Sequence, residues 1–266
     1  MRWNDGSPML ALITPTRGRP VALNLCRHYV HRMAERCPEP ITWIVVEGEE
    51  REAGGMKAHF GSIPLSQGRA LETVHIRVPS KGIYGHQSLA CNVQTGLREA
   101  RELGLRFVAV IEDDDWYAPD YASWVLRALA DYPLVGEGRS LYYNVHSGCW
   151  RLCQNMGHAS LCSTAWDDTA LPNVVDQAIN RCLNNEGFLD LLIWGHRGGW
   201  VAPPAPRRVV GLKGLPGIKG IGVGHQSGNL PCADADGSFL RVIIGEDSEV
   251  YRKFRGHNAF AEWEQR

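Results

Sequence analysis

The segment Arg106-Phe-Val-Ala-Val-Ile-Glu-Asp-Asp-Asp115 decides the fold that we expect for this chain. Its apolar part, residues 107–111, has no polar position, which is typical of a strand buried on both faces of a parallel sheet. Four acidic residues follow directly. Because ligands bind beyond the carboxyl ends of the strands in open α/β sheets, this acidic run marks the expected functional site.

Strands and helices alternate on both sides of this segment. Apolar runs predict three earlier strands, and the helical spacing of apolar residues predicts helices between them and after Pro119. The strands cover residues 9–14, 41–46 and 73–78, and the helices include residues 23–33, 89–100 and 121–132. This alternation predicts an α/β fold with a doubly wound, mainly parallel sheet, and the length of 266 residues fits a single domain.

The second half of the chain is less regular. Residues 139–152 and 159–166 have the composition of strands, and residues 174–183 and 189–194 have helical patterns. Gly, Pro and basic residues dominate residues 195–228, and Gly211–Gly220 lacks the composition of an ordinary helix or central strand. We expect a long mobile loop at 195–228 that orders on ligand, with a plain surface connector as the alternative.

The composition narrows the class of protein. Lys and Arg total 28, Asp and Glu total 29, and the formal charge of −1 excludes a global field that would draw the chain onto nucleic acid or an anionic bilayer. The chain starts without a signal-peptide core, and no run approaches the roughly 20 apolar residues of a membrane span. We therefore expect a cytoplasmic protein without integral membrane association.

The eight cysteines predict reduced thiols, since they are scattered through a chain without a secretory signal. Cys149, Cys153, His158 and Cys162 have the spacing C-x3-C-x4-H-x3-C, which differs from a zinc knuckle at its first and last intervals. We favour free thiols here, and a zinc site is the alternative.

Three adjacent carboxylates follow the apolar strand, those of Asp113, Asp114 and Asp115. Placing these like charges together costs free energy unless a positive charge neutralises them. Mg²⁺ or Mn²⁺ suits this role, because such ions take one or two carboxylates and complete their shell with phosphate oxygens and water. A metal that bridges a diphosphate stabilises the charge of the leaving group. The alternative is a solvated acidic turn that caps the helix near Pro119.

Four segments within the first 125 residues follow one another in an informative order. They are Ile13-Thr-Pro-Thr-Arg-Gly-Arg-Pro20, Ile44-Val-Val-Glu-Gly48, Ala90-Cys-Asn-Val-Gln-Thr-Gly-Leu97 and Val110-Ile-Glu-Asp-Asp-Asp-Trp-Tyr-Ala-Pro-Asp-Tyr121. In this order they resemble the family 2 glycosyltransferases of GT-A fold, and the last segment is the most specific. The resemblance implies a GT-A-like domain in which residues 1–125 bind a nucleotide sugar and residues 126–266 face the acceptor.

The resemblance also implies roles for residues of the first half. Asp113 and Asp115 would bind the metal, and Asp114 would lie near the donor ribose or sugar. The residues that would line the nucleotide are Thr14, Pro15, Thr16 and Arg17.

Other positions match the family less closely. Glu47 stands where the family usually has an aspartate that accepts from uracil, and Gly48 replaces a second acidic residue, which leaves the base open. Asn92 matches a donor-facing position, with a helix-surface amide as the alternative. Lys81 lies in the loop before that helix and would meet phosphate, with a solvated lysine as the alternative.

The late glycine-rich segment 222–228 contains His225, which we expect as a further metal ligand because some GT-A enzymes use a late histidine. An exposed loop histidine is the alternative. Residues 191–233 contain no acidic residue, so their basic side chains would close over a diphosphate or contact a phosphorylated acceptor or DNA. The basic residues are Arg197, Arg207, Arg208, Lys213 and Lys219.

An inverting sugar transfer needs a carboxylate that accepts the proton of the acceptor hydroxyl. Family 2 enzymes usually supply it from an acidic pair before an Asp-Leu helix, but Gly187 and Phe188 occupy these positions here. We expect Asp190 or Glu186 to be the catalytic base, followed by Asp167 or Asp168. A retaining mechanism without a dedicated base is the alternative.

These patterns predict a metal-dependent glycosyltransferase that uses a nucleotide diphosphate sugar, with UDP as the expected nucleotide. The acceptor stays open among a glycan, a small molecule, a protein and a hydroxylated base in modified DNA. A nucleotidyltransferase is the first alternative, although Thr14–Pro20 has only one glycine where a phosphate loop would have several. A non-catalytic nucleotide-sugar-binding module is the second.

Overall fold

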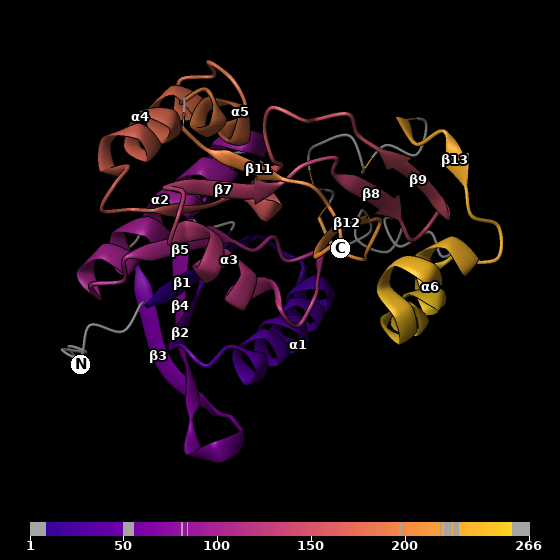
Figure 1. Cartoon of the computed structure of the whole chain (residues 1–266), viewed down its shortest axis with the longest axis horizontal. Helices are drawn as coiled ribbons and strands as arrows, with labels where there is room; N and C mark the ends of the chain where they lie inside the picture. Colours follow the sequence, from indigo (N-terminus) through magenta and orange to yellow (C-terminus); the bar gives the residue numbers. More distant parts are fainter. Residues whose placement is uncertain are drawn as a thin grey trace.

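A mixed sheet of eight strands forms the centre of the computed structural model (Figure 1). The structure describes residues 9–49, 56–80, 82–83, 85–196, 198–218, 220, 225 and 229–256. The strand order is β11-β7-β10-β5-β1-β2-β4-β3. The strands are β1 Leu10–Thr16, β2 Ile41–Glu49, β3 Lys57–Pro64, β4 Ala70–Pro79, β5 Phe107–Val110, β7 Leu134–Glu137, β10 Ala165–Asp167 and β11 Trp200–Ala202. β5, β1, β2 and β4 run parallel, whereas β3 and β10 pair antiparallel to their neighbours.

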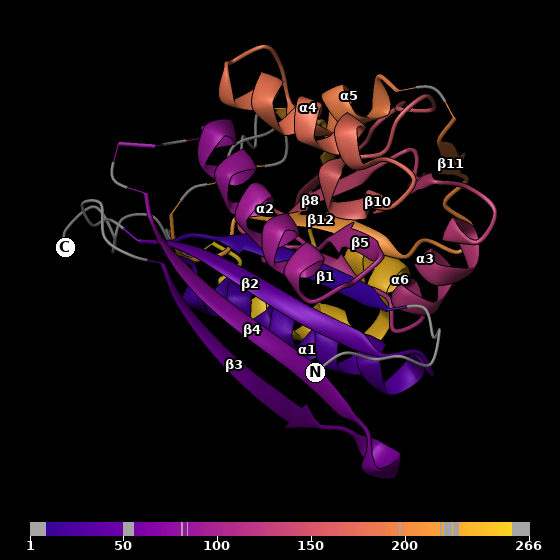
Figure 2. The ribbon, with the colours of Figure 1, turned by 90° about the vertical axis from the view of Figure 1, so that its left-hand side faces the viewer.

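Helices cover both faces of this sheet (Figure 2). Helices α1 (Pro20–Arg36) and α3 (Tyr121–Leu129) pack in the core of one face, and α2 (Gly85–Glu102), α4 (Pro172–Leu183) and α5 (Leu189–Trp194) pack in the core of the other. Along β1, Leu10 and Leu12 join the first core, and Ala11 and Ile13 join the second. This double burial explains why the central strands are apolar throughout.

A smaller sheet of five strands, in the order β13-β9-β8-β12-β6, adjoins the carboxyl end of β5. Its first strand, β6, begins directly after the acidic run. The strands are β6 Trp116–Tyr117, β8 Leu141–Asn144, β9 Cys149–Leu152, β12 Val209–Lys213 and β13 Cys232–Ala233, and helix α6 (Ser238–Ile244) packs into the first core beside them. The second half of the chain thus returns to the acidic run at residues 112–115.

The prediction that Gly211–Gly220 contains no central strand was wrong. β12 lies between β8 and β6, and Gly211 is one of its buried residues. A Cβ atom at Gly211 would stand 2.4 Å from the Tyr142 ring, so glycine is needed there for close approach of two strands. Because β11 and β12 occupy part of 195–228, the segment is not one long mobile loop.

The remaining expectations fared as follows. The mixed α/β architecture, the four strands of the first half and the helices are confirmed, but the sheet is mixed where we expected it to be mainly parallel. β3 was missed because its residues are exposed and mostly not apolar. Residues 139–152 contain two strands, β8 and β9. Of the strand expected at residues 159–166, only the end forms one, as part of β10. Among the described residues, no helix is long and apolar enough to cross a membrane.

Candidate functional site

The acidic run leaves the carboxyl end of β5 and turns directly into β6. Asp113, Asp114 and Asp115 are almost fully buried, with exposed fractions of 1%, 3% and 1%. Tyr117 fixes the turn, since its hydroxyl accepts a hydrogen bond from the Glu112 backbone N–H at 2.8 Å. The alternative of a solvated acidic turn is therefore wrong.

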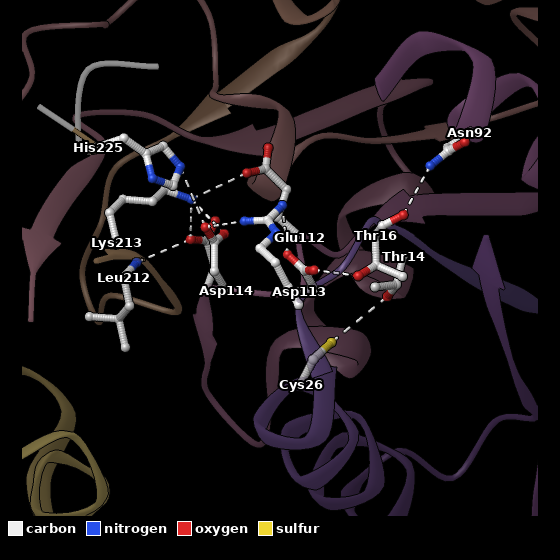
Figure 3. Close-up of polar contacts among 12 residues, drawn as sticks. Thr14, Thr16, Cys26, Asn92, Glu112, Asp113, Asp114, Leu212, Lys213 and His225 are labelled. Atoms are coloured by element: carbon white, nitrogen blue, oxygen red, sulfur yellow. Dashed lines mark hydrogen bonds and ion pairs between the residues drawn. The ribbon is translucent and has the colours of Figure 1, made fainter. Parts of the chain in front are cut away.

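Thr16 at the end of β1 (Figure 3) and Arg19 just before α1 hold the first two aspartates. Thr16 donates its hydroxyl to Asp113 at 2.5 Å, and the Arg19 guanidinium contacts Asp113 at 3.0 Å and Asp114 at 2.6 Å. Burial lowers the pKa of Arg19, but the charges of Asp113 and Asp114 outweigh this and raise it above its ordinary value. Arg19 was not among the predicted site residues, although it lies within the first family-like segment.

Lys213, the last residue of β12, holds the other side of the acidic run. Its ammonium lies 2.6 Å from Asp115 Oδ1, 2.7 Å from Asp114 Oδ1 and 3.3 Å from Glu112 Oε2. The backbone N–H of Leu212 also donates to Asp115 Oδ1 at 3.0 Å. Lys213 was expected in a loop that closes over phosphate, but it lies in strand β12 and contacts the acidic run.

The pKa values of the three aspartates diverge. Burial raises the pKa of Asp113 to about 6 despite the opposing charge of Arg19, and burial raises the pKa of Asp115 well above its ordinary value despite Lys213. Burial acts on Asp114 too, but Lys213 and Arg19 together lower its pKa below the ordinary value. Lys213 and Arg19 thus stabilise the charged form of Asp114, whereas burial favours the neutral forms of Asp113 and Asp115.

The residues that could hold a metal include Asp115, one of the pair that the resemblance implied. Within the described part of the chain, Glu112, Asp115 and Cys162 offer ligand atoms within 4.8 Å of one another. Asp115 Oδ2 is buried and accepts no hydrogen bond there. Burial raises the pKa of the Cys162 thiol well above its ordinary value, and the two carboxylates are the hard oxygen donors of the group.

Asp113 and His225 lie outside this group. Asp113 Oδ2 accepts a hydrogen bond from Thr16, and Asp113 Oδ1 lies 3.0 Å from the Arg19 guanidinium but, like Asp115 Oδ2, is buried without a hydrogen bond among the described residues. His225 Nε2 lies 3.5 Å from Asp114 Oδ2, so the histidine does approach the acidic run, but it contacts the aspartate that already pairs with Lys213 and Arg19.

The donor loop expected at Thr14–Arg17 is fixed by contacts within the protein. The Thr14 hydroxyl accepts a hydrogen bond from Trp43 Nε1 at 2.9 Å, and Thr14 is fully buried. Pro15 belongs to β1 and pairs with Val46. Arg17 donates to the backbone oxygen of Ile83. Of this loop, Thr16 and Arg17 reach the carboxyl edge of the sheet.

Asn92 on α2 is buried and holds the ends of β1 and β2 together. Its amide donates to the backbone oxygens of Thr16 at 3.2 Å and Val46 at 3.3 Å, so the alternative of a helix-surface amide is wrong. Glu47 lies next to Thr16 in the sheet register, and its Oε2 atom forms a hydrogen bond with His75 Nε2 at 3.0 Å. Lys81 lies outside the described residues.

A cavity of about 270 Å³ adjoins the acidic run and contains one of the two expected base residues. Asp190, at the start of α5, lines it together with Glu112 and Lys213. Burial raises the pKa of Asp190. Further lining residues are His86, Leu89, Tyr142, Cys153, Asn155, His158, Ser160, Leu161, Phe188, Leu189 and Leu191.

The other candidate bases do not line this cavity. Glu186 is exposed and pairs with Arg181 at 2.9 Å. Asp167 pairs with Arg106 at 2.6 Å, and its place beside Phe107 puts it at the amino end of β5, opposite the acidic run. Asp168 pairs with Arg101 at 2.6 Å. Asp190 is therefore the candidate that the fold brings to the site.

The zinc alternative finds no support among the residues that the structure describes. All eight cysteines are free, and the pattern of Cys149, Cys153, His158 and Cys162 does not form a metal-ligand group there. Cys162 instead faces Glu112 and Asp115.

The basic segment is also neutralised where it is described. Arg207 pairs with Glu137 at 3.3 Å and Arg208 with Asp120 at 3.1 Å. Together with the buried Lys213, these side chains are engaged by acidic residues of the same chain. Arg197 and Lys219 lie outside the described residues.

No protein-family model matches this chain, and no curated protein matches it in sequence.

Proposed function

We propose that this protein is a glycosyltransferase that moves a sugar from a nucleotide diphosphate sugar to a hydroxyl group of an acceptor. The observation that carries the proposal is the cavity that Asp190, Glu112 and Lys213 line together. Asp190 offers this cavity a carboxylate that can take a proton, and Glu112 and Lys213 offer it charged groups that suit a metal and a diphosphate. Of these residues, Glu112 belongs to the last of the four family-like segments.

The donor nucleotide would bind at the carboxyl ends of β1 and β2. Thr16 and Glu47 are partners in the register of these strands, so a hydroxyl and a carboxylate stand side by side at this edge. Glu47 would accept from an N–H of the base, with uracil as the proposed base. Asn92 supports this edge from below by bonding both strands.

Glu112 and Asp115 are the residues that would hold Mg²⁺ or Mn²⁺. The buried, unpartnered Oδ2 atom of Asp115 and the carboxylate of Glu112 fit such an ion, since both offer hard oxygen donors. When bound, the ion would neutralise the negative charge that develops on the leaving diphosphate.

Asp190 would act as the catalytic base. In an inverting transfer, the acceptor oxygen bonds to the anomeric carbon, the bond from that carbon to the diphosphate oxygen breaks, and Asp190 takes the hydroxyl proton. Burial supports this role, because a carboxylate with a raised pKa is a stronger base.

The cavity lining suits an acceptor that carries a ring. Leu89, Phe188 and Leu191 contribute apolar side chains to the lining, and Asn155 and Ser160 contribute polar side chains that bond to Ser140. A sugar ring and a hydroxylated base both have a face that can lie against apolar side chains. The paired arginines of the basic segment add no support for a DNA acceptor in particular.

The proposal is tested by nucleoside diphosphate release from a panel of nucleotide sugars with Mn²⁺ and pooled acceptors. We expect release with one sugar donor, and Asp115→Asn should abolish metal-dependent turnover while the protein stays folded. A binding module would release nothing, and a nucleotidyltransferase would release pyrophosphate from a nucleoside triphosphate instead. Either outcome would remove the proposal.

A matched pair of variants tests the base. Asp190→Asn should lower the transfer rate by about 10²- to 10⁴-fold, the usual contribution of general base catalysis. Glu186→Gln, which alters an exposed carboxylate outside the cavity, should leave the rate unchanged. Equal rates for the two variants would reject Asp190 as the base.

A further inference from the structure

The ammonium of Lys213 lies among the carboxylates that a divalent cation would use (Figure 3). Lys213 is 3% exposed, and its Nζ atom lies within 3.3 Å of oxygens from Glu112, Asp114 and Asp115. Three acidic contacts to one buried lysine are more than an ordinary surface ion pair provides. The charge of Lys213 therefore makes the burial of the acidic run possible.

Two of these contacts involve the proposed metal donors. Lys213 lies 2.6 Å from Asp115 Oδ1 and 3.3 Å from Glu112 Oε2. A divalent cation bound by the same two carboxylates would lie within a few ångströms of the ammonium. Because like charges repel strongly at such distances inside a protein, the two cations cannot share these carboxylates without cost.

We propose that Lys213 is a tethered counter-ion that holds the acidic run assembled in the absence of a divalent cation and competes with that cation for Glu112 and Asp115. The choice of cation rests on the proposed function. The competition itself rests only on the position of the ammonium.

The surroundings allow this exchange. Asp115 keeps its hydrogen bond from the Leu212 backbone N–H, which does not depend on the ammonium, so its carboxylate stays in place when Lys213 moves. Lys213 also lines the cavity, which gives the displaced ammonium a place to move. A diphosphate bound in that cavity would attract the ammonium, so donor binding and metal binding would favour each other.

The test measures Mn²⁺ binding to the protein without any nucleotide, by the electron paramagnetic resonance signal of free Mn²⁺. Lys213→Met removes the ammonium and should tighten Mn²⁺ binding at least tenfold relative to the wild-type protein. Lys57→Met removes the same charge from an exposed position on β3 and should leave Mn²⁺ affinity unchanged. Unchanged or weaker Mn²⁺ binding by Lys213→Met would overturn the proposal.

A second measurement covers the case in which Lys213→Met does not fold. In the wild-type protein, Mg²⁺ is titrated while the side-chain ammonium signals are followed by NMR, with Lys213→Arg used to assign the signal of Lys213. We expect Mg²⁺ binding to shift this signal as the ammonium leaves the carboxylates. Saturation with Mg²⁺ without any change in the signal, or no Mg²⁺ binding at all, would refute the competition.

These outcomes are separate from those that test the enzyme. Tighter Mn²⁺ binding by Lys213→Met without turnover of any nucleotide sugar would support the counter-ion and reject the proposed function. Turnover of a nucleotide sugar with no effect of Lys213→Met on Mn²⁺ binding would support the proposed function and reject the counter-ion.

Discussion

Replacing Asp113 with asparagine should change how the stability of the protein depends on pH. Burial raises the pKa of Asp113 from 3.8 to about 6 in the folded protein. The folded state therefore holds this proton more tightly than the unfolded state, so the stabilisation is fully present below pH 3.8 and is lost as the pH rises through 6. A shift of about two pKa units corresponds to about 3 kcal/mol, of which about 2 kcal/mol is lost between pH 4 and pH 7.

Asp113→Asn has no proton to lose at this position, so it does not lose this stabilisation. The free energy of unfolding of the variant minus that of the wild-type protein should rise by about 2 kcal/mol between pH 4 and pH 7. Urea unfolding at several pH values, with a chelator present to remove divalent cations, measures this difference. A difference that is independent of pH, or that falls as the pH rises, would refute the argument that burial dominates at Asp113.

Three further substitutions test the support of the site. Arg19→Met leaves two buried carboxylates without their guanidinium and should lower the free energy of unfolding by about 3–5 kcal/mol, measured by urea unfolding. Asn92→Ala removes two buried hydrogen bonds from α2 to β1 and β2, should cost about 1–3 kcal/mol in the same assay, and should weaken donor binding measured by calorimetry. Gly211→Ala forces a methyl group against a tyrosine ring and should cost about 1–3 kcal/mol, seen as a lower Tm, whereas Gly157→Ala, with nothing within 4 Å, should leave the Tm unchanged.

The sequence predicted the parts of the fold whose signal is local. The doubly buried strands near Leu12, Ile44 and Val108 are apolar on both faces, so composition alone was enough to find them. The acidic run was placed correctly for the same reason, because it directly follows such a strand. β3 was missed because an exposed edge strand need not carry an apolar pattern, as its largely exposed Phe60 and neighbouring polar residues illustrate.

The partners of the acidic run could not be predicted, because they depend on contacts far apart in the chain. Lys213 reaches Asp115 across nearly a hundred residues, and nothing in its local sequence distinguishes it from a solvated loop lysine. Gly211 was misleading, since a glycine that allows two strands to approach looks the same in sequence as a glycine in a turn. The choice of Asp190 over Glu186 as the candidate base likewise depends on which residue lines the cavity, and local sequence does not show this.

The long reach of Lys213 has a consequence for how this protein can be divided. A fragment that ends at residue 125 would contain every acidic residue of the triplet but not the lysine that neutralises Asp114 and Asp115. During synthesis on a ribosome, which proceeds from the amino terminus, these carboxylates must wait for β12 before they can be enclosed. The first 125 residues alone therefore lack one of the side chains that encloses the acidic run.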